Sequence, residues 1–215
     1  MPGIGKLIYH EFMVQNRSNN LVRYSFIFFI FYPLSISFIS SQDNITEFGL
    51  LCLIISLPLC FINISNNLIK PDMEDGSLEM LLITHLPWQI AAAKYIAVCI
   101  AVLAGFFLAT PVIYFIFNLD IRTQTLIVAV SFLLITISAS LGCLIASMEC
   151  YFKSNTNLLA LIVMPMIIPS IILAGITLGG EDYKGIILIM LGVNLSVIPI
   201  FLYFSSYLIE NIYNI

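Results

Sequence analysis

Charged residues are scarce in this sequence. Asp, Glu, Lys and Arg together make up 9% of the 215 residues, whereas an ordinary water-soluble protein carries about a quarter. Hydrophobic residues make up 60%, and the mean hydropathy is +1.05. So little charge cannot cover a surface in water, so lipid must cover most of the chain. The composition excludes a soluble domain and predicts an all-α integral membrane protein, with one transmembrane domain over residues 1–215.

The sequence also lacks the motifs of a membrane enzyme or an ATPase. Neither H-E-x-x-H nor G-x-S-x-G occurs, and the Gly5-Lys6 pair has no phosphate-binding loop around it. The five cysteines form no C-x-x-C pair and fall in or beside apolar runs, which favours packing over redox or metal chemistry. A net charge of −4 gives no attraction for nucleic acid. We therefore expect a chain that is not an enzyme and that binds no metal, cofactor or nucleic acid directly.

Six apolar runs are each long enough to cross a bilayer as a helix. They lie at about residues 22–41, 46–69, 92–118, 124–147, 157–179 and 186–209. The runs are continuous and do not alternate, which favours six transmembrane helices over a β-barrel. Basic residues are concentrated on the side that this layout assigns to both termini, so the termini are predicted to be cytoplasmic. Six basic residues lie on that side, namely Lys6, Arg17, Arg23, Lys70, Lys94 and Lys153, and only Arg122 and Lys184 lie on the other.

The segment before the first run is too polar to cross the membrane. Ile4, Leu7, Ile8 and Phe12 recur at helical spacing, with charged residues among them. This pattern favours an amphipathic helix in the membrane interface over an unstructured tail.

The centres of the predicted spans contain no ionisable residues. Carriers driven by protons or ions usually place such residues there, so this chain is not predicted to be one of them. For the asparagines in the spans, including Asn63 and Asn194, hydrogen bonds between helices are favoured over substrate contact. Small residues at every fourth position predict close helix contacts: Ala93, Ala97, Ala101, Gly105 and Ala109 in one span, and Ser138, Gly142 and Ala146 in the next.

The densest charge lies in the loop of residues 70–88, which holds four of the twelve acidic residues. Leu78, Leu81 and Leu82 have the spacing of one face of a short helix. Acidic residues precede this helix, where they favour the positive end of its dipole, and Gly76 can supply the turn into it. Because the segment is acidic, docking on a protein partner is favoured over docking on an anionic membrane surface or on the chain's own bundle. The spacing does not fit a calcium loop.

This loop carries a resemblance to a known family. The sequence P-D-M-E-D-G-S-L-E-M-L-L, Pro71 to Leu82, followed by Lys94 at the start of the third span, closely resembles the haem exporter protein B family. The run from Met164 to Pro169 is similar to the L-P-L-x-I-P run in that family's fifth span. Length and six-span layout match as well. One departure is His10-Glu11, where the family commonly has an Arg-Asp pair.

The resemblance implies an ABC exporter permease in the bacterial inner membrane that serves cytochrome c maturation. Two copies of the permease would sit on a dimer of ABC ATP-binding subunits, which bind ATP and Mg. The resemblance also implies two further partners, a haem-handling membrane protein and a periplasmic haem chaperone. Haem is the candidate substrate. Either haem itself is exported, or the ATPase cycle releases the haem-loaded chaperone.

Within this family, a coupling helix in residues 72–86 would insert into the ATPase. Pro165 and Pro169, four residues apart on one face of the fifth span, are candidates for a helix kink with a gating role. Two alternatives stay open: a permease for another lipid-like or hydrophobic substrate, and a membrane scaffold that transports nothing. The residues predicted to contact the ATPase are Asp72, Glu74, Asp75, Gly76, Ser77, Leu78, Glu79, Leu81 and Leu82.

Overall fold

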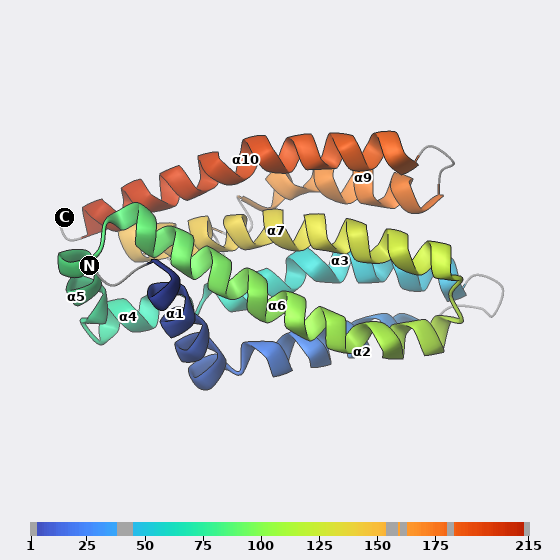
Figure 1. The fold of residues 1–215 in the computed structure, drawn as a ribbon, viewed down its shortest axis with the longest axis horizontal. Helices are drawn as coiled ribbons and strands as arrows, with labels where there is room; N and C mark the ends of the chain where they lie inside the picture. The colour runs from blue at the N-terminus through green and yellow to red at the C-terminus, as the bar shows by residue number, and fades with distance from the viewer. Residues whose placement is uncertain (1–3, 38–44, 154–158, 160–162, 180–182, 213–215) are drawn as a thin grey trace.

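The structure is a computed structural model that describes residues 4–37, 45–153, 159, 163–179 and 183–212. Every regular element within these residues is a helix, and the long helices pack side by side in one elongated bundle (Figure 1). The predicted all-α fold is confirmed. The helices are α1 (Ile4–Asn19), α2 (Leu21–Ser37), α3 (Ile45–Ser65), α4 (Lys70–Glu74), α5 (Ser77–Thr84), α6 (Pro87–Phe117), α7 (Ile121–Phe152), the 3-10 helix η2 (Met164–Ile167), α9 (Ile168–Gly179) and α10 (Tyr183–Asn211).

Four helical stretches of the described chain are long and apolar enough to cross a membrane. They are Gly49–Glu74, Pro87–Phe117, Ile121–Phe152 and Tyr183–Asn211, which coincide with the second, third, fourth and sixth predicted spans. Shorter apolar helices, Leu21–Ser35 and Pro165–Gly179, lie where the first and fifth spans are predicted. Four membrane-length helices are therefore established, and six crossings stay a prediction.

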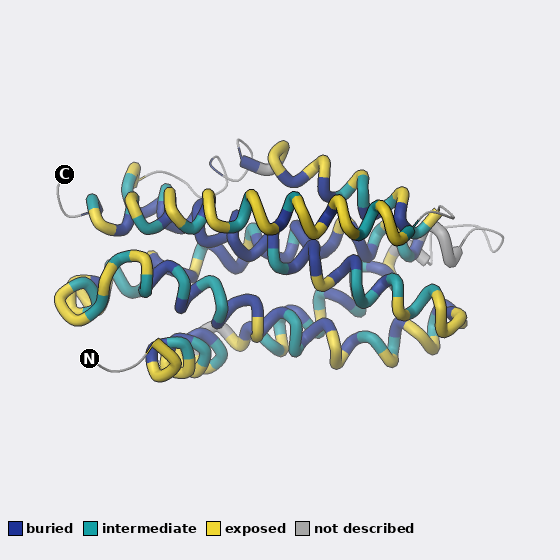
Figure 2. Tube along the Cα trace, turned by 45° about the horizontal axis from the view of Figure 1, so that its top comes forward, coloured by how far each residue is buried: buried dark blue, intermediate teal, exposed yellow. Residues whose placement is uncertain are grey.

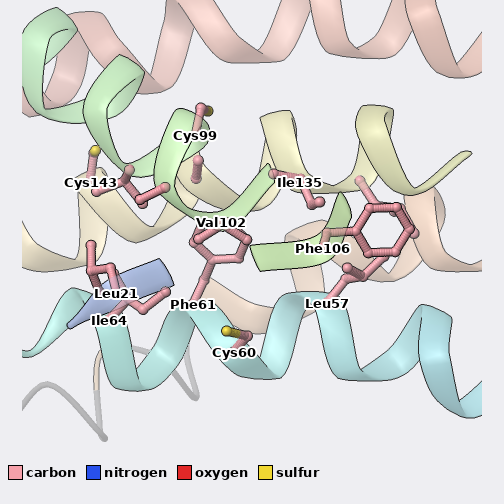
Figure 3. Close-up of a cluster of buried hydrophobic side chains, with 14 of the residues drawn as sticks. Leu21, Leu57, Cys60, Phe61, Ile64, Cys99, Val102, Phe106, Ile135 and Cys143 are labelled. Carbon is pink, nitrogen blue, oxygen red and sulfur yellow. The ribbon is translucent and has the colours of Figure 1, made fainter. Parts of the chain in front are cut away.

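α7 lies at the centre of the bundle. Between Leu133 and Cys150 it is buried on almost every side, as expected for a helix that is apolar all round. The other helices turn buried faces inward and exposed faces outward (Figure 2). The main core cluster fills the space between α2, α3, α6 and α7 (Figure 3). A second cluster, which includes Ile137, Ile167 and Phe201, joins α7 to η2 and α10.

The predicted close helix contacts are confirmed on α6, where all five small residues of the repeat are buried. At Gly105 a methyl group would lie 2.0 Å from Ser25 Oγ, so α2 and α6 approach each other closely there. Asparagines bridge helices as predicted. Asn194 Nδ2 donates to the Leu133 carbonyl at 2.8 Å, and Asn63 Nδ2 donates to the Tyr24 hydroxyl at 2.9 Å.

The start of α1, helices α4 and α5, the start of α6 and the ends of α7 and α10 lie together at one end of the bundle (Figure 1). We call this the α5 end. α6 begins there at Pro87, where the first turn of a helix needs no proline N–H. At the opposite end, the Arg122 guanidinium lies over the Tyr183 ring, 5.2 Å from its centre.

Candidate functional site

A buried lysine joins three helices at the α5 end. Lys94 of α6 is only 1% exposed, and its Nζ donates to Glu11 Oε2 of α1 at 3.0 Å. It also donates to the Asp72 carboxylate of α4 and, at 3.2 Å, to the carbonyl of Leu68. A buried ammonium group is costly unless it is paired and hydrogen-bonded, and here three acceptors match its three N–H donors. We call Lys94, Glu11 and Asp72 the Lys94 cluster, which fixes α1, α4 and α6 relative to one another.

The Lys94 cluster determines which side of α1 faces the bundle. Leu7, Glu11 and Gln15 are spaced by four residues and are all buried, whereas Ile4 is exposed. Gln15 Nε2 donates to the Leu68 carbonyl at 3.3 Å. The helix itself agrees with the sequence prediction, but its buried face is partly polar because Lys94 supplies the counter-charge for Glu11. Its location in a membrane interface stays a prediction.

His10 and Glu11, which stand where the family commonly has an Arg-Asp pair, point to different sides of α1. His10 is exposed, whereas Glu11 makes the contact with Lys94. The acid of the pair is therefore the member with a fixed partner, and the residue beside it faces outward.

A second ionic contact ties α4 to α7. Lys70 Nζ lies 3.6 Å from Glu149 Oε1, and the Glu149 side chain is 8% exposed. Sequence reasoning missed Glu149 because it follows the predicted fourth span, and a single acid near the end of an apolar run has no distinctive spacing. With Asp72 and Lys70 both engaged, the short helix α4 is held against two long helices.

The leucine face of α5 packs on the chain's own bundle. Gly76 precedes α5 with a φ of 73°, a left-handed conformation that suits glycine. Leu78 is fully buried in the main core, and Leu81 and Leu82 are half-buried against it. The Leu78 side chain has no exposed surface in this structure, and its predicted contact with the ATPase stays a prediction.

The opposite face of α5 carries exposed apolar side chains. Met80 is 73% exposed and Ile83 is 84% exposed, and Leu86 and Trp88 continue the patch beyond the helix. Large apolar side chains this exposed mark a candidate interaction surface when they gather in one place. Sequence reasoning did not single out Met80 and Ile83, although their spacing of three residues places them on one helix face.

The predicted contact residues therefore divide into two groups. Asp72 and Leu78 face inward, and Leu81 and Leu82 lie half-buried at the edge. Exposed positions are Glu74, Asp75, Gly76, Ser77 and Glu79. The exposed group forms an acidic rim beside Met80 and Ile83.

The two candidate gating prolines lie elsewhere in the bundle. Pro165 is in η2 and Pro169 is in the first turn of α9, and both are exposed. Helix α9 lies away from α5 in the bundle (Figure 1). The change from 3-10 to α-helix falls between them, as is common near proline. Their gating role stays a prediction.

One family model matches nearly the whole chain, including all the residues of the candidate site. Residues 4–208 match the family model described as CcmB protein. The uncharacterized protein RP268 of Rickettsia prowazekii (strain Madrid E) is 40% identical over 215 residues, with both chains fully covered. The uncharacterized protein RC0356 of Rickettsia conorii (strain ATCC VR-613 / Malish 7) is 39% identical over the same length, also with full coverage. The family match confirms the resemblance seen in the segment from Pro71 to Leu82.

Proposed function

The chain belongs to the CcmB protein family, whose members are membrane permease subunits of haem export in cytochrome c maturation. We propose that this chain transmits the conformational change of a separate ATPase subunit to the membrane helices. The transmitting segment is residues 72–86. ATP and Mg are bound by the ATPase subunit, and this chain catalyses no reaction of its own. The observation that carries the proposal is the two-sided construction of α5, which is anchored on one face and exposed on the other.

The exposed face suits a protein cleft. Met80 and Ile83 offer apolar anchors, and Glu74, Asp75 and Glu79 surround them with negative charge. A cleft with an apolar floor and a basic rim would complement this surface, since buried apolar anchors supply affinity and rim charges supply orientation.

The buried face of α5 would transmit a displacement of α5 to the membrane helices. Leu78 is locked in the core, and Asp72 is held by Lys94, so a push on α5 is carried to α6. Glu11 carries the same push to α1. The contact resists separation because parting a buried ion pair leaves an uncompensated charge. The Lys94 cluster is thus a rigid joint between the partner surface and the membrane helices.

The assembly that we propose follows the family. Two copies of this chain, each crossing the bacterial inner membrane six times with both termini in the cytoplasm, sit on two ATPase subunits. A haem-handling membrane protein and a periplasmic haem chaperone complete the complex. The cycle either moves haem or releases the haem-loaded chaperone, with Pro165 and Pro169 as the gating positions. Support comes from the shared location of α5, the start of α1 and the end of α10 at one end of the bundle.

Affinity purification in mild detergent tests the partner surface. We expect Met80→Asp with Ile83→Asp, and separately Asp75→Lys with Glu79→Lys, to abolish co-purification of the ATPase subunit. A matched control is Ile121→Asp, because Ile121 is 75% exposed at the opposite end of the bundle. Full assembly and full cytochrome c production in both double variants would overturn the proposal. Haem that co-elutes with the wild-type complex would identify the substrate.

A further inference from the structure

A second polar site lies at the α5 end, between α4 and the end of α7, and shares only Glu74 with the acidic rim beside α5. A pocket of about 220 Å³ is lined by Lys70, Met73 and Glu74 from α4, by Glu149 and Cys150 from α7, and by Lys153, which ends α7. Two lysines and two glutamates line one small space, so the charge of its walls is balanced.

In the membrane layout that we propose, this pocket lies at the depth of lipid headgroups. Two of the membrane-length stretches, Gly49–Glu74 and Ile121–Phe152, end at this pocket. The ends of spanning helices lie at the membrane surface, and lysines there extend their ammonium groups toward the headgroups. A lipid that binds here from the bilayer therefore places its headgroup in the pocket.

One carboxylate oxygen of Glu149 has no hydrogen-bond donor in the part of the chain that the structure describes. The residue is 7% exposed, and its Oε2 is buried with no hydrogen-bond partner among the described residues. Its only ionic contact there, with Lys70, is long at 3.6 Å, and the Lys70 side chain is 53% exposed. A buried carboxylate oxygen without a donor is costly. A positively charged N–H donor from a ligand would satisfy this oxygen.

We propose that this pocket binds the headgroup of an aminophospholipid of the phosphatidylethanolamine class. The primary ammonium donates to Glu149, which closes over it, and the phosphodiester lies between Lys70 and Lys153. Met73 and Cys150 offer apolar contact to the glycerol end of the lipid. A zwitterion fits walls of balanced charge better than an anionic lipid does. A choline headgroup fits less well, because its quaternary ammonium has no N–H to donate.

Competition between lipids tests the proposal. The purified full-length chain is exchanged into detergent containing equal amounts of phosphatidylethanolamine, phosphatidylcholine and phosphatidylglycerol with identical acyl chains, and retained lipids are counted by native mass spectrometry. We expect about tenfold more phosphatidylethanolamine than phosphatidylcholine, the ratio that corresponds to about 1.4 kcal/mol and one charge-assisted hydrogen bond. Equal retention of the three lipids, or a preference for phosphatidylglycerol, would overturn the proposal.

Variants separate the two halves of the site. Glu149→Gln should remove the preference for ethanolamine over choline, whereas Lys70→Gln with Lys153→Gln should reduce retention of both lipids. Glu149→Asp keeps the negative charge, but its shorter side chain moves the carboxylate away from the headgroup. We therefore expect a preference for ethanolamine over choline between those of the wild type and Glu149→Gln. Glu210→Gln is the matched control, since Glu210 is an exposed acid near the end of α10. If Glu149→Gln retains the full preference, Glu149 does not select the headgroup and the proposal fails.

A soluble headgroup distinguishes the source of the ligand. The melting temperature of the wild-type chain is measured with phosphatidylethanolamine and with the same concentration of glycerophosphoethanolamine, which lacks acyl chains. We expect stabilisation by the lipid alone. Equal stabilisation by both would overturn the assignment to a membrane lipid. Melting of each variant without added lipid confirms that it is folded.

Discussion

At the scale of single residues, Lys94 is the position on which the α5 end depends most. It is 1% exposed and is the common partner of Glu11 and Asp72. Replacing Lys94 with Met removes the charge that both carboxylates face. We expect the free energy of unfolding to fall by about 3 kcal/mol or more, the cost of breaking a buried ion pair on one side only. Denaturant unfolding in detergent measures it, with Lys184→Met, an exposed lysine of α10, as the control.

A neutral replacement of the whole Lys94 cluster checks this explanation. In the triple variant Lys94→Met, Glu11→Gln and Asp72→Asn no charge is left without a partner, so most of the lost stability should return. A change of less than about 0.5 kcal/mol in the single Lys94→Met variant would contradict the buried contact.

Sequence reasoning reached some of these residues and missed others. Asn63 and Asn194 were identified because a polar group inside an apolar run needs a partner. The pairing of Lys94 with Glu11 was not, although both residues were noted individually. They lie 83 residues apart in the chain, and spacing along a sequence says nothing about which distant helices meet.

At the scale of helices, the contact between α2 and α6 depends on Gly105. A methyl group there would lie 2.0 Å from Ser25 Oγ and 2.9 Å from the carbonyl oxygen of Val22. We expect Gly105→Ala to destabilise the fold by about 1–2 kcal/mol, because overcrowding outweighs the higher helix propensity of alanine. The melting temperature of Gly105→Ala in detergent, compared with that of the wild type, shows whether the substitution destabilises the fold.

The control for this substitution has the opposite expected sign. Gly192 in α10 has no atoms within 4 Å of an added methyl group, so Gly192→Ala should stabilise the chain by up to about 1 kcal/mol. If both alanine variants raise the melting temperature, α2 and α6 are not in close contact at Gly105.

For α5, the sequence predicted the helix and its apolar face but not what covers that face. Periodicity shows which side chains share a face, whereas the surface that buries them depends on distant helices. Leu78 is therefore in the chain's own core, and the exposed apolar surface falls on Met80 and Ile83. The length of a helix is easier to predict, and α6, α7 and α10 lie close to the ranges predicted for them.

At the scale of the whole molecule, the ion pairs of the described residues gather at one end of the bundle. The three ion pairs found among the described residues, two at Lys94 and one at Glu149, all lie at the α5 end. The opposite end has the contact of Arg122 with Tyr183, which is weaker because it pairs a cation with an aromatic ring. These ion pairs therefore stabilise the end where the proposed ATPase would push.

This asymmetry makes the orientation in the membrane the most informative property of the whole chain to measure. Single cysteines are introduced after the five native cysteines are replaced, and bacterial spheroplasts are treated with a membrane-impermeant maleimide. We expect Asp43→Cys, Arg122→Cys and Lys184→Cys to react in intact spheroplasts, because each position follows an odd-numbered predicted span. His10→Cys and Glu79→Cys should react only after permeabilisation, because the excess of basic residues keeps their side of the chain in the cytoplasm.

Each position in this experiment tests a different part of the layout. If the apolar helix Leu21–Ser35 does not cross the membrane but Gly49–Glu74 does, Asp43→Cys and Arg122→Cys would both be protected and Glu79→Cys would react from outside. Protection of Lys184→Cys alone would show that Pro165–Gly179 does not cross the membrane. Reaction of Glu79→Cys from outside would place α5 on the wrong side for any ATP-driven partner, and the proposed coupling would then be physically impossible.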